Sequence, residues 1–299
     1  MRVFVTGASG FIGSAVVKEL IAAGHQVLGL ARSDASAHAV AAAGAEVLRG
    51  DLDQLDVLKR GARESDGVIH TAFVHDFSDW HRSIETDRVA IEAFGEALEG
   101  TNKPFIAAAG CVGIAPPGGI ATEDQPLDPT FFRKSEPAAL ALAGRGVRAM
   151  ALRLPPTVHG EGDHGFVATL IAIARDKGVS AYIGDGTNRW SAVHRLDAAR
   201  AFRLALEKGR AGARYQAIAD QGVPTREIAD VIGANLHLPV TSISADEAPA
   251  HFTWLALFYG MDGAASSAQT RKELGWEPTH EALIPDMERH YFHNVVEHR

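Results

Sequence analysis

The feature that most constrains the fold is a glycine-rich segment near the N-terminus, Thr6–Gly13, with the sequence TGASGFIG. The apolar run Val3–Val5 precedes it, and a helical stretch over 15–23 follows it. A strand, a glycine turn and a helix in this order form a dinucleotide site, because the free N–H groups at the helix N-terminus attract a pyrophosphate. We therefore expect dinucleotide binding here; the alternative is an ordinary glycine-rich turn.

Each glycine of this segment has its own expected role. Gly7 permits the tight turn, Gly10 lets the backbone approach the pyrophosphate, and Gly13 lets the helix pack against the strand. The residues expected to contact the cofactor in this segment are Gly7, Ser9, Gly10, Phe11, Ile12 and Gly13.

The first half of the chain alternates short apolar runs with helical patterns. The expected strands are 3–5, 26–31, 46–48, 67–70, 104–108 and 147–152, and the expected helices are 15–23, 35–43, 55–61, 84–98 and 137–143. Strands separated by helices pair in parallel through right-handed crossovers, with helices on both faces of the sheet. We expect an α/β fold with a doubly wound parallel sheet of the Rossmann type.

The pattern changes after Arg153, where Pro155 and Pro156 interrupt the alternation. Expected helices here are 167–177, 196–207, 226–234 capped by Thr225, 245–258 and 270–274. We expect residues 1–153 to form the dinucleotide-binding core, with 190–218 returning to it. Residues 154–189 and 219–299 then form a smaller C-terminal substrate domain over the carboxyl ends of the strands.

Composition excludes several classes of function. The chain has 299 residues and a net charge of -8, so neither nucleic acid nor an anionic membrane surface is an expected partner. Cys111 is the single cysteine, which leaves no internal disulfide and no cysteine zinc cluster. No apolar run reaches membrane-spanning length, and residues 1–30 lack a signal-peptide layout. We expect a cytoplasmic protein.

The end of the second strand predicts the cofactor preference. An acidic residue there would bond the ribose and repel a 2′-phosphate, but Arg32 and Ser33 come first and suit that phosphate. Asp34 is expected to cap the following helix. We therefore expect NADP(H) rather than NAD(H), the alternative for Arg32 being a solvated surface side chain. Asp51 either accepts a hydrogen bond from the adenine amino group or caps the next helix.

Nearly the whole chain resembles the extended branch of the short-chain dehydrogenase/reductase superfamily, which includes NAD-dependent epimerases and dehydratases. Four segments beyond the TGxxGxxG motif carry this resemblance: Asp51-Leu52, the VIHxAA-like segment Val68–Phe73, the VHxxDxA-like segment 193–199, and Ser267–Trp276. The resemblance implies that Asp51, Leu52, Thr71, Ala72 and Phe73 line the cofactor site.

The chain departs from this superfamily at the catalytic residues. The superfamily uses a YxxxK pair on the helix before the sixth strand, where the tyrosine transfers a proton and the lysine holds the ribose. None of the four tyrosines lies between the fifth strand and Arg153. In one register Phe131 and Ser135 replace the pair, and in another Thr130 and Lys134 do. Ala107–Cys111 stands where the superfamily has its serine, so this is an atypical member.

Other side chains are candidates for the missing chemistry. Lys134 would still hold the ribose, and His75 or His159 would transfer a proton near neutral pH; each has the alternative of a structural or solvated role. Cys111 is discounted as a nucleophile, because nothing near it in the sequence lowers its pKa. The residues His159, Glu161, Asp163 and His164 lack an established metal spacing, and we expect no metal. Arg153, Arg189 and Trp190 either bind substrate or serve internal contacts.

These observations lead to one reading with two alternatives. We expect an NADPH-dependent oxidoreductase that reduces a C=O or C=N group, including an imine or hemiaminal, of a small to medium organic substrate. The alternatives are a non-catalytic NADP(H)-binding redox sensor and a nucleotide-sugar epimerase or dehydratase. The resemblance also implies a possible homodimer through the helices 84–98 and 137–143.

Overall fold

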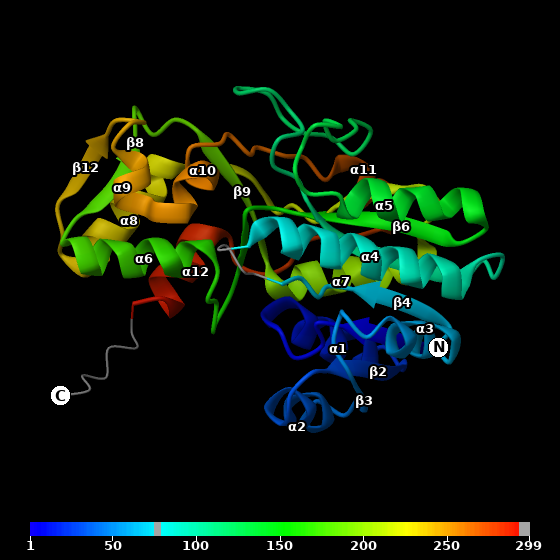
Figure 1. Ribbon diagram of the computed structural model, residues 1–299. Helices are drawn as coiled ribbons and strands as arrows, with labels where there is room; N and C mark the ends of the chain where they lie inside the picture. The colour runs from blue at the N-terminus through cyan, green and yellow to red at the C-terminus, as the bar shows by residue number, and fades with distance from the viewer. Residues whose placement is uncertain (75–78, 293–299) are drawn as a thin grey trace.

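The computed structural model describes residues 1–74 and 79–292, and it forms two lobes that lie side by side (Figure 1). The larger lobe contains a seven-stranded sheet in the order β10-β6-β5-β4-β1-β2-β3, and its neighbouring strands pair in parallel. Its strands are β1 (Arg2–Thr6), β2 (Gln26–Ala31), β3 (Glu46–Arg49), β4 (Gly67–His70), β5 (Pro104–Gly110), β6 (Arg148–Leu154) and β10 (Arg214–Gln216). The expected doubly wound parallel sheet is confirmed.

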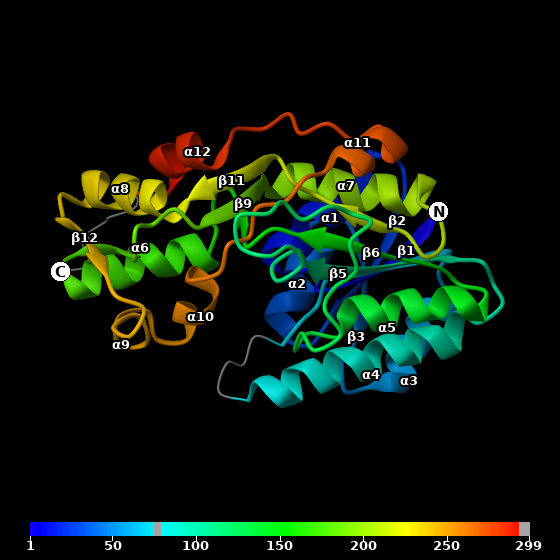
Figure 2. The ribbon, with the colours of Figure 1, turned by 90° about the horizontal axis from the view of Figure 1, so that it is seen from above.

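Helices cover both faces of this sheet (Figure 2). On one face lie α1 (Phe11–Ala22), α2 (Asp34–Ala42), α7 (Arg195–Lys208) and α11 (Ala268–Leu274). On the other lie α3 (Leu55–Arg63), α4 (Trp80–Leu98), α5 (Ser135–Ala141) and the 3-10 helix η1 (Leu142–Arg145). Because both faces are covered, the central strand β4 is buried along its whole length, which fits the apolar residues Val68 and Ile69.

The smaller lobe is built around two small sheets, with strand orders β11-β9-β7 and β12-β8. Its strands are β7 (Thr157–His159), β8 (Ser180–Ile183), β9 (Arg189–His194), β11 (Asp220–Pro224) and β12 (Val240–Ile243). Its helices are α6 (Phe166–Lys177), α8 (Thr225–Leu236), α9 (Ala248–Phe252), η2 (Thr253–Leu255), α10 (Ala256–Tyr259) and α12 (Leu283–His290). Their apolar side chains form a separate core around Trp190 and Phe252.

The division of the chain into a core over residues 1–153 and a substrate domain stays a proposal, and the two lobes differ from it at two places. β10 and α7 lie in the larger lobe, but β9 pairs with β7 and β11 in the smaller sheet. α11 packs against α7 and β10, so part of the last stretch also lies on the larger lobe. Within the described residues, no helix is long and apolar enough to cross a membrane.

Several local predictions were wrong. The helix expected over 245–258 is divided into α9, η2 and α10, because Thr253 adopts a positive φ of 54° that an α-helix cannot continue through. Thr225 is the first residue of α8, and Pro224 occupies the cap position. The cap of α2 is Ser33, so Asp34 is its first helical residue. Asp51 does not cap α3, whose cap position is Gln54.

Candidate cofactor and active site

The glycine turn joins β1 to α1 with little space for side chains. Gly7 has a positive φ of 70°, and its carbonyl oxygen accepts a hydrogen bond of 2.8 Å from the amide of Gly10. A Cβ atom on Gly13 would lie 2.0 Å from the Gly7 oxygen, whereas one on Gly10 would lie 3.2 Å from it. Gly13 is therefore required for the turn itself. Gly10 keeps the turn accessible from outside.

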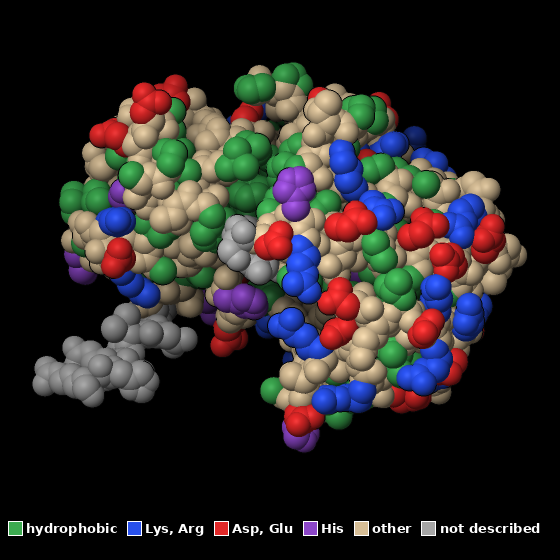
Figure 3. Space-filling view, in the orientation of Figure 1, with side chains coloured by type: hydrophobic (Ala, Val, Ile, Leu, Met, Phe, Trp, Pro, Cys, Tyr) green, Lys and Arg blue, Asp and Glu red, His purple; other side chains and the backbone are tan. Residues whose placement is uncertain are grey.

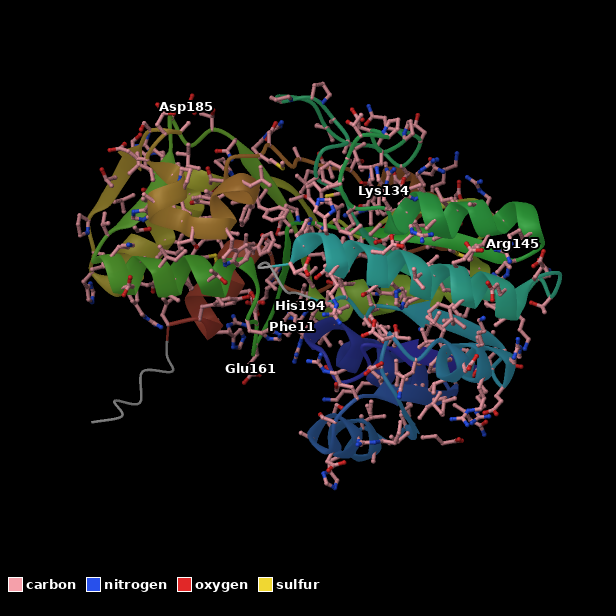
Figure 4. The ribbon with its side chains drawn as sticks, in the orientation of Figure 1. Phe11, Lys134, Arg145, Glu161, Asp185 and His194 are labelled. Carbon is pink, nitrogen blue, oxygen red and sulfur yellow. The ribbon has the colours of Figure 1, made fainter. Side chains whose placement is uncertain are left out.

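The N-terminus of α1 faces the junction of the two lobes. Gly10 occupies its cap position, and within the described residues no side chain caps its amides. The ring of Phe11 lies 5.8 Å from the ring of His164, and the Arg195 guanidinium lies 4.9 Å above it. Figure 4 places Phe11 beside His194, and Figure 3 shows the surface hollowed between the lobes on this side. Uncapped amides and a nearby cation suit a pyrophosphate.

Arg32 and Ser33 follow β2 at the end where an adenosine ribose would lie. The Ser33 hydroxyl accepts a bond from the Ser36 amide, and Ser36 returns one to the Ser33 amide, which forms a capping box. The Asp34 carboxylate pairs with Arg49 at 2.8 Å. Arg32 is exposed and forms no hydrogen bond or ion pair with any residue that the structure describes.

Asp51 and Leu52 lie after β3, before α3 begins. The Asp51 carboxylate accepts a bond of 3.1 Å from the Asp53 amide and is otherwise exposed. Leu52 packs at the edge of the core under α3. Their contact with adenine stays a prediction.

The segment after β4 packs directly against the glycine turn. The Thr71 hydroxyl donates to the Thr6 carbonyl at 2.7 Å, and the Ala72 amide donates to the Thr6 hydroxyl at 3.3 Å. A Cβ atom on Gly7 would lie 2.8 Å from the Ala72 nitrogen. Phe73 comes next, with its ring 5.5 Å from that of Trp80. His75, our candidate proton donor, lies outside the described residues.

Lys134 lies in the loop before α5 and not on the helix. Its ammonium donates to the carbonyl oxygens of Pro129 at 2.7 Å and Phe131 at 2.6 Å. Those bonds hold it within its own loop, so ribose binding by Lys134 requires them to break. The YxxxK position that we expected on a helix precedes the first residue of α5, Ser135.

His159 is fully buried at the end of β7. Its Nδ1 lies 2.7 Å from a carboxylate oxygen of Asp286, and its Nε2 has no hydrogen-bond partner among the described residues. Its ring is 5.5 Å from that of His194, which stacks on His280 at 4.6 Å. Burial and the charge of His159 lower the pKa of His194 to about 4. Because His159 is buried, it is not accessible to a substrate in this conformation and serves a structural role. This burial weakens our prediction that His159 transfers a proton.

The other polar candidates serve internal contacts. Arg153 is buried and paired with Glu136, and Arg189 is paired with Asp262 at 2.7 Å. The Trp190 side chain lies in the core of the smaller lobe. Burial raises the pKa of the Cys111 thiol to about 11, which leaves it protonated and a poor nucleophile. Among the described residues, no group of three or more His, Cys, Asp or Glu side chains is placed to hold a metal ion.

The sequence reasoning missed two arginines that lie next to the predicted cofactor residues. Arg195 contacts Phe11, and the Arg133 guanidinium lies 4.4 Å above the Phe73 ring. The sequence could have indicated Arg195 as a cofactor-site residue, since it lies inside the VHxxDxA-like segment. No sequence pattern indicated Arg133, because its contact with Phe73 depends on how the loop before α5 folds across the end of β4.

The family model for the NAD dependent epimerase/dehydratase family matches residues 3–96. An uncharacterised protein of Schizosaccharomyces pombe is 50% identical over 289 residues, which cover 96% of this chain and 98% of that protein. This chain belongs to the NAD-dependent epimerase/dehydratase family. The predicted family membership is thus confirmed, and with it the use of an NAD(P) cofactor by the family.

More distant similar proteins differ in the activities that their names give. A 4-hydroxy-2-methyl-3-oxo-4-farnesyl-3,4-dihydroquinoline-1-oxide ketoreductase of Stigmatella aurantiaca is 27% identical over 228 residues, covering 72% of this chain and 67% of that protein. The structure of a dTDP-glucose 4,6-dehydratase of Streptomyces venezuelae, solved with NAD bound, is 22% identical to this chain, with a TM-score of 0.78. The match covers 97% of this chain and 96% of the dehydratase chain. At this identity, the second comparison shows the shared fold alone.

Proposed function

We propose that this protein is an NADPH-dependent oxidoreductase that reduces a C=O or C=N group of a small to medium organic substrate. The observation that carries the proposal is the charge at the end of β2. Arg32 offers an exposed guanidinium with no partner among the described residues, while Arg49 neutralises the Asp34 carboxylate. A 2′-phosphate would pair with Arg32, and Arg49 would offset part of the repulsion from Asp34.

Residues near the expected pyrophosphate and near the expected nicotinamide also support cofactor binding. The glycine turn and the uncapped N-terminus of α1 suit the pyrophosphate, with Arg195 as a nearby cation. A bound nicotinamide would supply a hydride to the substrate. The protein would hold the nicotinamide end against the segment Thr71–Phe73, which contacts the glycine turn.

The loop before α5 bears on the choice of reaction. It carries Phe132, Arg133 and Lys134 and no tyrosine, so no phenol is available there as a proton donor. Epimerases and dehydratases of this family depend on that tyrosine, so we rank a nucleotide-sugar reaction last. The ketoreductase activity of the Stigmatella relative supports reduction as the reaction class.

A non-catalytic redox sensor is the second candidate. The observation that favours it is the engagement of Lys134 by two backbone carbonyls, which leaves the ribose without the lysine of the superfamily. A sensor would distinguish NADPH from NADP⁺ and show no turnover.

The test begins with calorimetric titration of the four nucleotides NADPH, NADP⁺, NADH and NAD⁺. NADPH oxidation is then measured with a panel of ketones, aldehydes and imines. We expect micromolar binding confined to the phosphorylated pair, followed by NADPH oxidation with members of the carbonyl or imine classes. Binding without any turnover across the panel would support the sensor, and preference for NAD(H) would overturn the cofactor assignment.

A further inference from the structure

Arg133 lies at the carboxyl edge of the sheet, in the loop just before α5. Its Nε donates to the Ser135 hydroxyl at 2.9 Å, and one Nη donates to the Ala108 carbonyl oxygen at 3.4 Å. Its guanidinium also lies 4.4 Å from the centre of the Phe73 ring. The second Nη forms no hydrogen bond with the described residues. The side chain is thus fixed at three points, and three of its five N–H groups form no hydrogen bond with the described residues.

A buried polar chain connects Arg133 to the glycine turn. The Ser135 hydroxyl donates to the Asp87 carboxylate at 2.5 Å, and the other Asp87 oxygen lies 3.2 Å from Nε2 of His70. Nδ1 of His70 lies 2.7 Å from the hydroxyl of Thr6, the last residue of β1. The chain links four elements, β1, β4, α4 and α5, so it fixes the position of Arg133 relative to the dinucleotide turn.

Asp87 provides a negative charge without touching the guanidinium. Burial alone would raise the pKa of Asp87, but bonds from His70 and Ser135 and the charge of Arg133 lower it overall, so the carboxylate stays ionised. Desolvation lowers the pKa of Arg133, although an arginine remains charged at physiological pH. The Arg133 guanidinium is poorly solvated, and the Ser135 hydroxyl separates it from the Asp87 carboxylate. It therefore still gains energy by binding an anionic oxygen directly.

A series of aromatic side chains extends from Phe73, which lies under Arg133, into the smaller lobe. The Trp80 ring is 5.5 Å from Phe73 and 5.6 Å from Phe132. Phe258 of α10 lies 6.2 Å from Phe132. The series continues in the smaller lobe through Phe166 and Trp254, where Phe166 is 5.2 Å from Phe258 and 5.7 Å from Trp254.

These rings form an apolar surface that the fold leaves partly open. Trp254 is 36% exposed, and its neighbour Leu257 is 58% exposed. Figure 3 shows hydrophobic side chains gathered where the lobes meet, between α10 and the start of α4. A sugar would bring hydroxyl groups that these rings cannot hydrogen-bond, whereas a flat apolar molecule would bury its surface against them.

We propose that Arg133 binds the oxygen of the substrate carbonyl, and that the substrate is an apolar aromatic carbonyl compound whose ring lies against Trp80, Phe132 and Phe258. This inference rests on the proposed reductase function and narrows it. A guanidinium beside the reacting group attracts a developing oxyanion and repels an iminium ion, so Arg133 selects C=O over C=N.

The reaction at this position balances without a tyrosine. A bound reduced nicotinamide would supply a hydride to the carbonyl carbon, and the π electron pair of the C=O bond would move onto oxygen. Arg133 stabilises the resulting alkoxide but cannot release a proton at neutral pH. Water donates that proton, so the ketone, NADPH and one proton become the alcohol and NADP⁺.

The first test measures binding, so that it does not depend on turnover. 2-Naphthoate places a carboxylate on a flat ring, and 2-naphthylmethanol is its neutral counterpart. Calorimetry on the NADP⁺-saturated protein compares the unsubstituted chain with Arg133→Gln. We expect Arg133→Gln to bind naphthoate at least about tenfold more weakly, the effect of losing a charge-assisted pair, while the affinity for 2-naphthylmethanol changes less than about twofold.

Two further variants control for folding and for charge. Arg133→Lys keeps the charge but loses the planar fork, and we expect it to recover part of the naphthoate affinity. Arg145→Gln changes a half-buried arginine that pairs with Glu92 of α4 and with Glu99, the residue after α4, and we expect no effect (Figure 4). Unchanged NADP⁺ affinity shows that each variant is folded.

The second test measures NADPH oxidation with 2-acetonaphthone. We expect kcat/KM to fall at least about a hundredfold in Arg133→Gln, a loss typical of removing one oxyanion donor. If Arg133→Gln binds naphthoate as tightly as the unsubstituted chain does, the assignment of Arg133 is overturned. Turnover of 2-acetonaphthone would then support the reductase function but not the role of Arg133. Affinity that depends on Arg133, with no turnover of any carbonyl by the unsubstituted chain, would instead overturn the reductase function.

Discussion

The carboxylate of Asp34 and the guanidinium of Arg49 are 2.8 Å apart, although β3 and the start of α2 are separated in the sequence. The same arginine also donates to the carbonyl oxygen of Ser33. This exposed pair offsets part of the negative charge of Asp34, the acidic residue that would otherwise discriminate against a phosphorylated ribose. Cofactor preference therefore depends on Arg49 as well as on Arg32.

Two substitutions separate these contributions. Arg32→Ala removes the expected phosphate partner, and we expect NADPH affinity to fall by about tenfold with NADH affinity almost unchanged. Arg49→Ala frees the Asp34 carboxylate, so it should weaken NADPH binding and strengthen NADH binding. Calorimetric titration of both nucleotides measures the ratio. Arg175→Ala on α6 is the control, and a ratio that stays constant in Arg32→Ala would refute the role of Arg32.

The glycine turn predicts a graded response to added methyl groups. In Gly13→Ala the new Cβ would lie 2.0 Å from the Gly7 oxygen, which forces the turn apart. We therefore expect this variant to lose nucleotide binding. We also expect its unfolding free energy to fall by about 1–3 kcal/mol or more, the cost of overpacking. Gly10→Ala meets the same oxygen at 3.2 Å and should fold while binding nucleotide more weakly. Gly144→Ala, with open space around it, is the neutral control. Urea unfolding and NADP⁺ titration give the two readouts.

The buried ion pair between Arg153 and Glu136 predicts a large effect on stability. Glu136 receives two bonds from Arg153, at 2.6 and 2.8 Å, and one from Arg214 at 2.9 Å. Glu136→Ala would leave a buried cation unpaired, which costs about 3–5 kcal/mol of unfolding free energy. Glu92→Ala breaks an exposed pair with Arg145 and should cost less than about 1 kcal/mol. Equal losses in urea unfolding would contradict this assignment.

The histidine cluster predicts a loss of stability in acid. Burial, together with the charges of His159 and His280, lowers the pKa of His194 to about 4 in the folded state, against 6.5 as its ordinary value. Between these two values the unfolded chain binds a proton that the folded protein does not, so the stability falls as the pH drops from about 6.5 to 4. His194→Gln should flatten this part of the stability profile.

The exposed His38 provides the matched control for that measurement. Urea midpoints of His194→Gln and His38→Gln are compared with those of the unsubstituted chain at half-unit pH intervals. A His194→Gln profile that parallels the unsubstituted one would show that other groups cause the acid loss.

Much of the larger lobe could be predicted from the sequence because local patterns determine it. The turn at Gly7, the apolar strands and the helices between them follow from backbone conformation, burial and crossover handedness, which act over short stretches of chain. The residues proposed for the cofactor end of the site rest on the same kind of local pattern, since Gly7, Arg32 and Thr71 each come directly after a strand that ends at one edge of the sheet. The short strands of the smaller lobe lack such periodicity, and only their pairing identifies them.

Tertiary structure alone decided the roles of the charged side chains. His159 follows a strand as a proton donor would, yet the packing of α12 buries it against Asp286. Lys134 is drawn back to its own loop, while its neighbour Arg133 extends over Phe73 and onto the polar chain that ends at Thr6. Neighbouring residues point to different partners because long side chains respond to charges and cavities supplied by distant segments, and no local pattern records those segments.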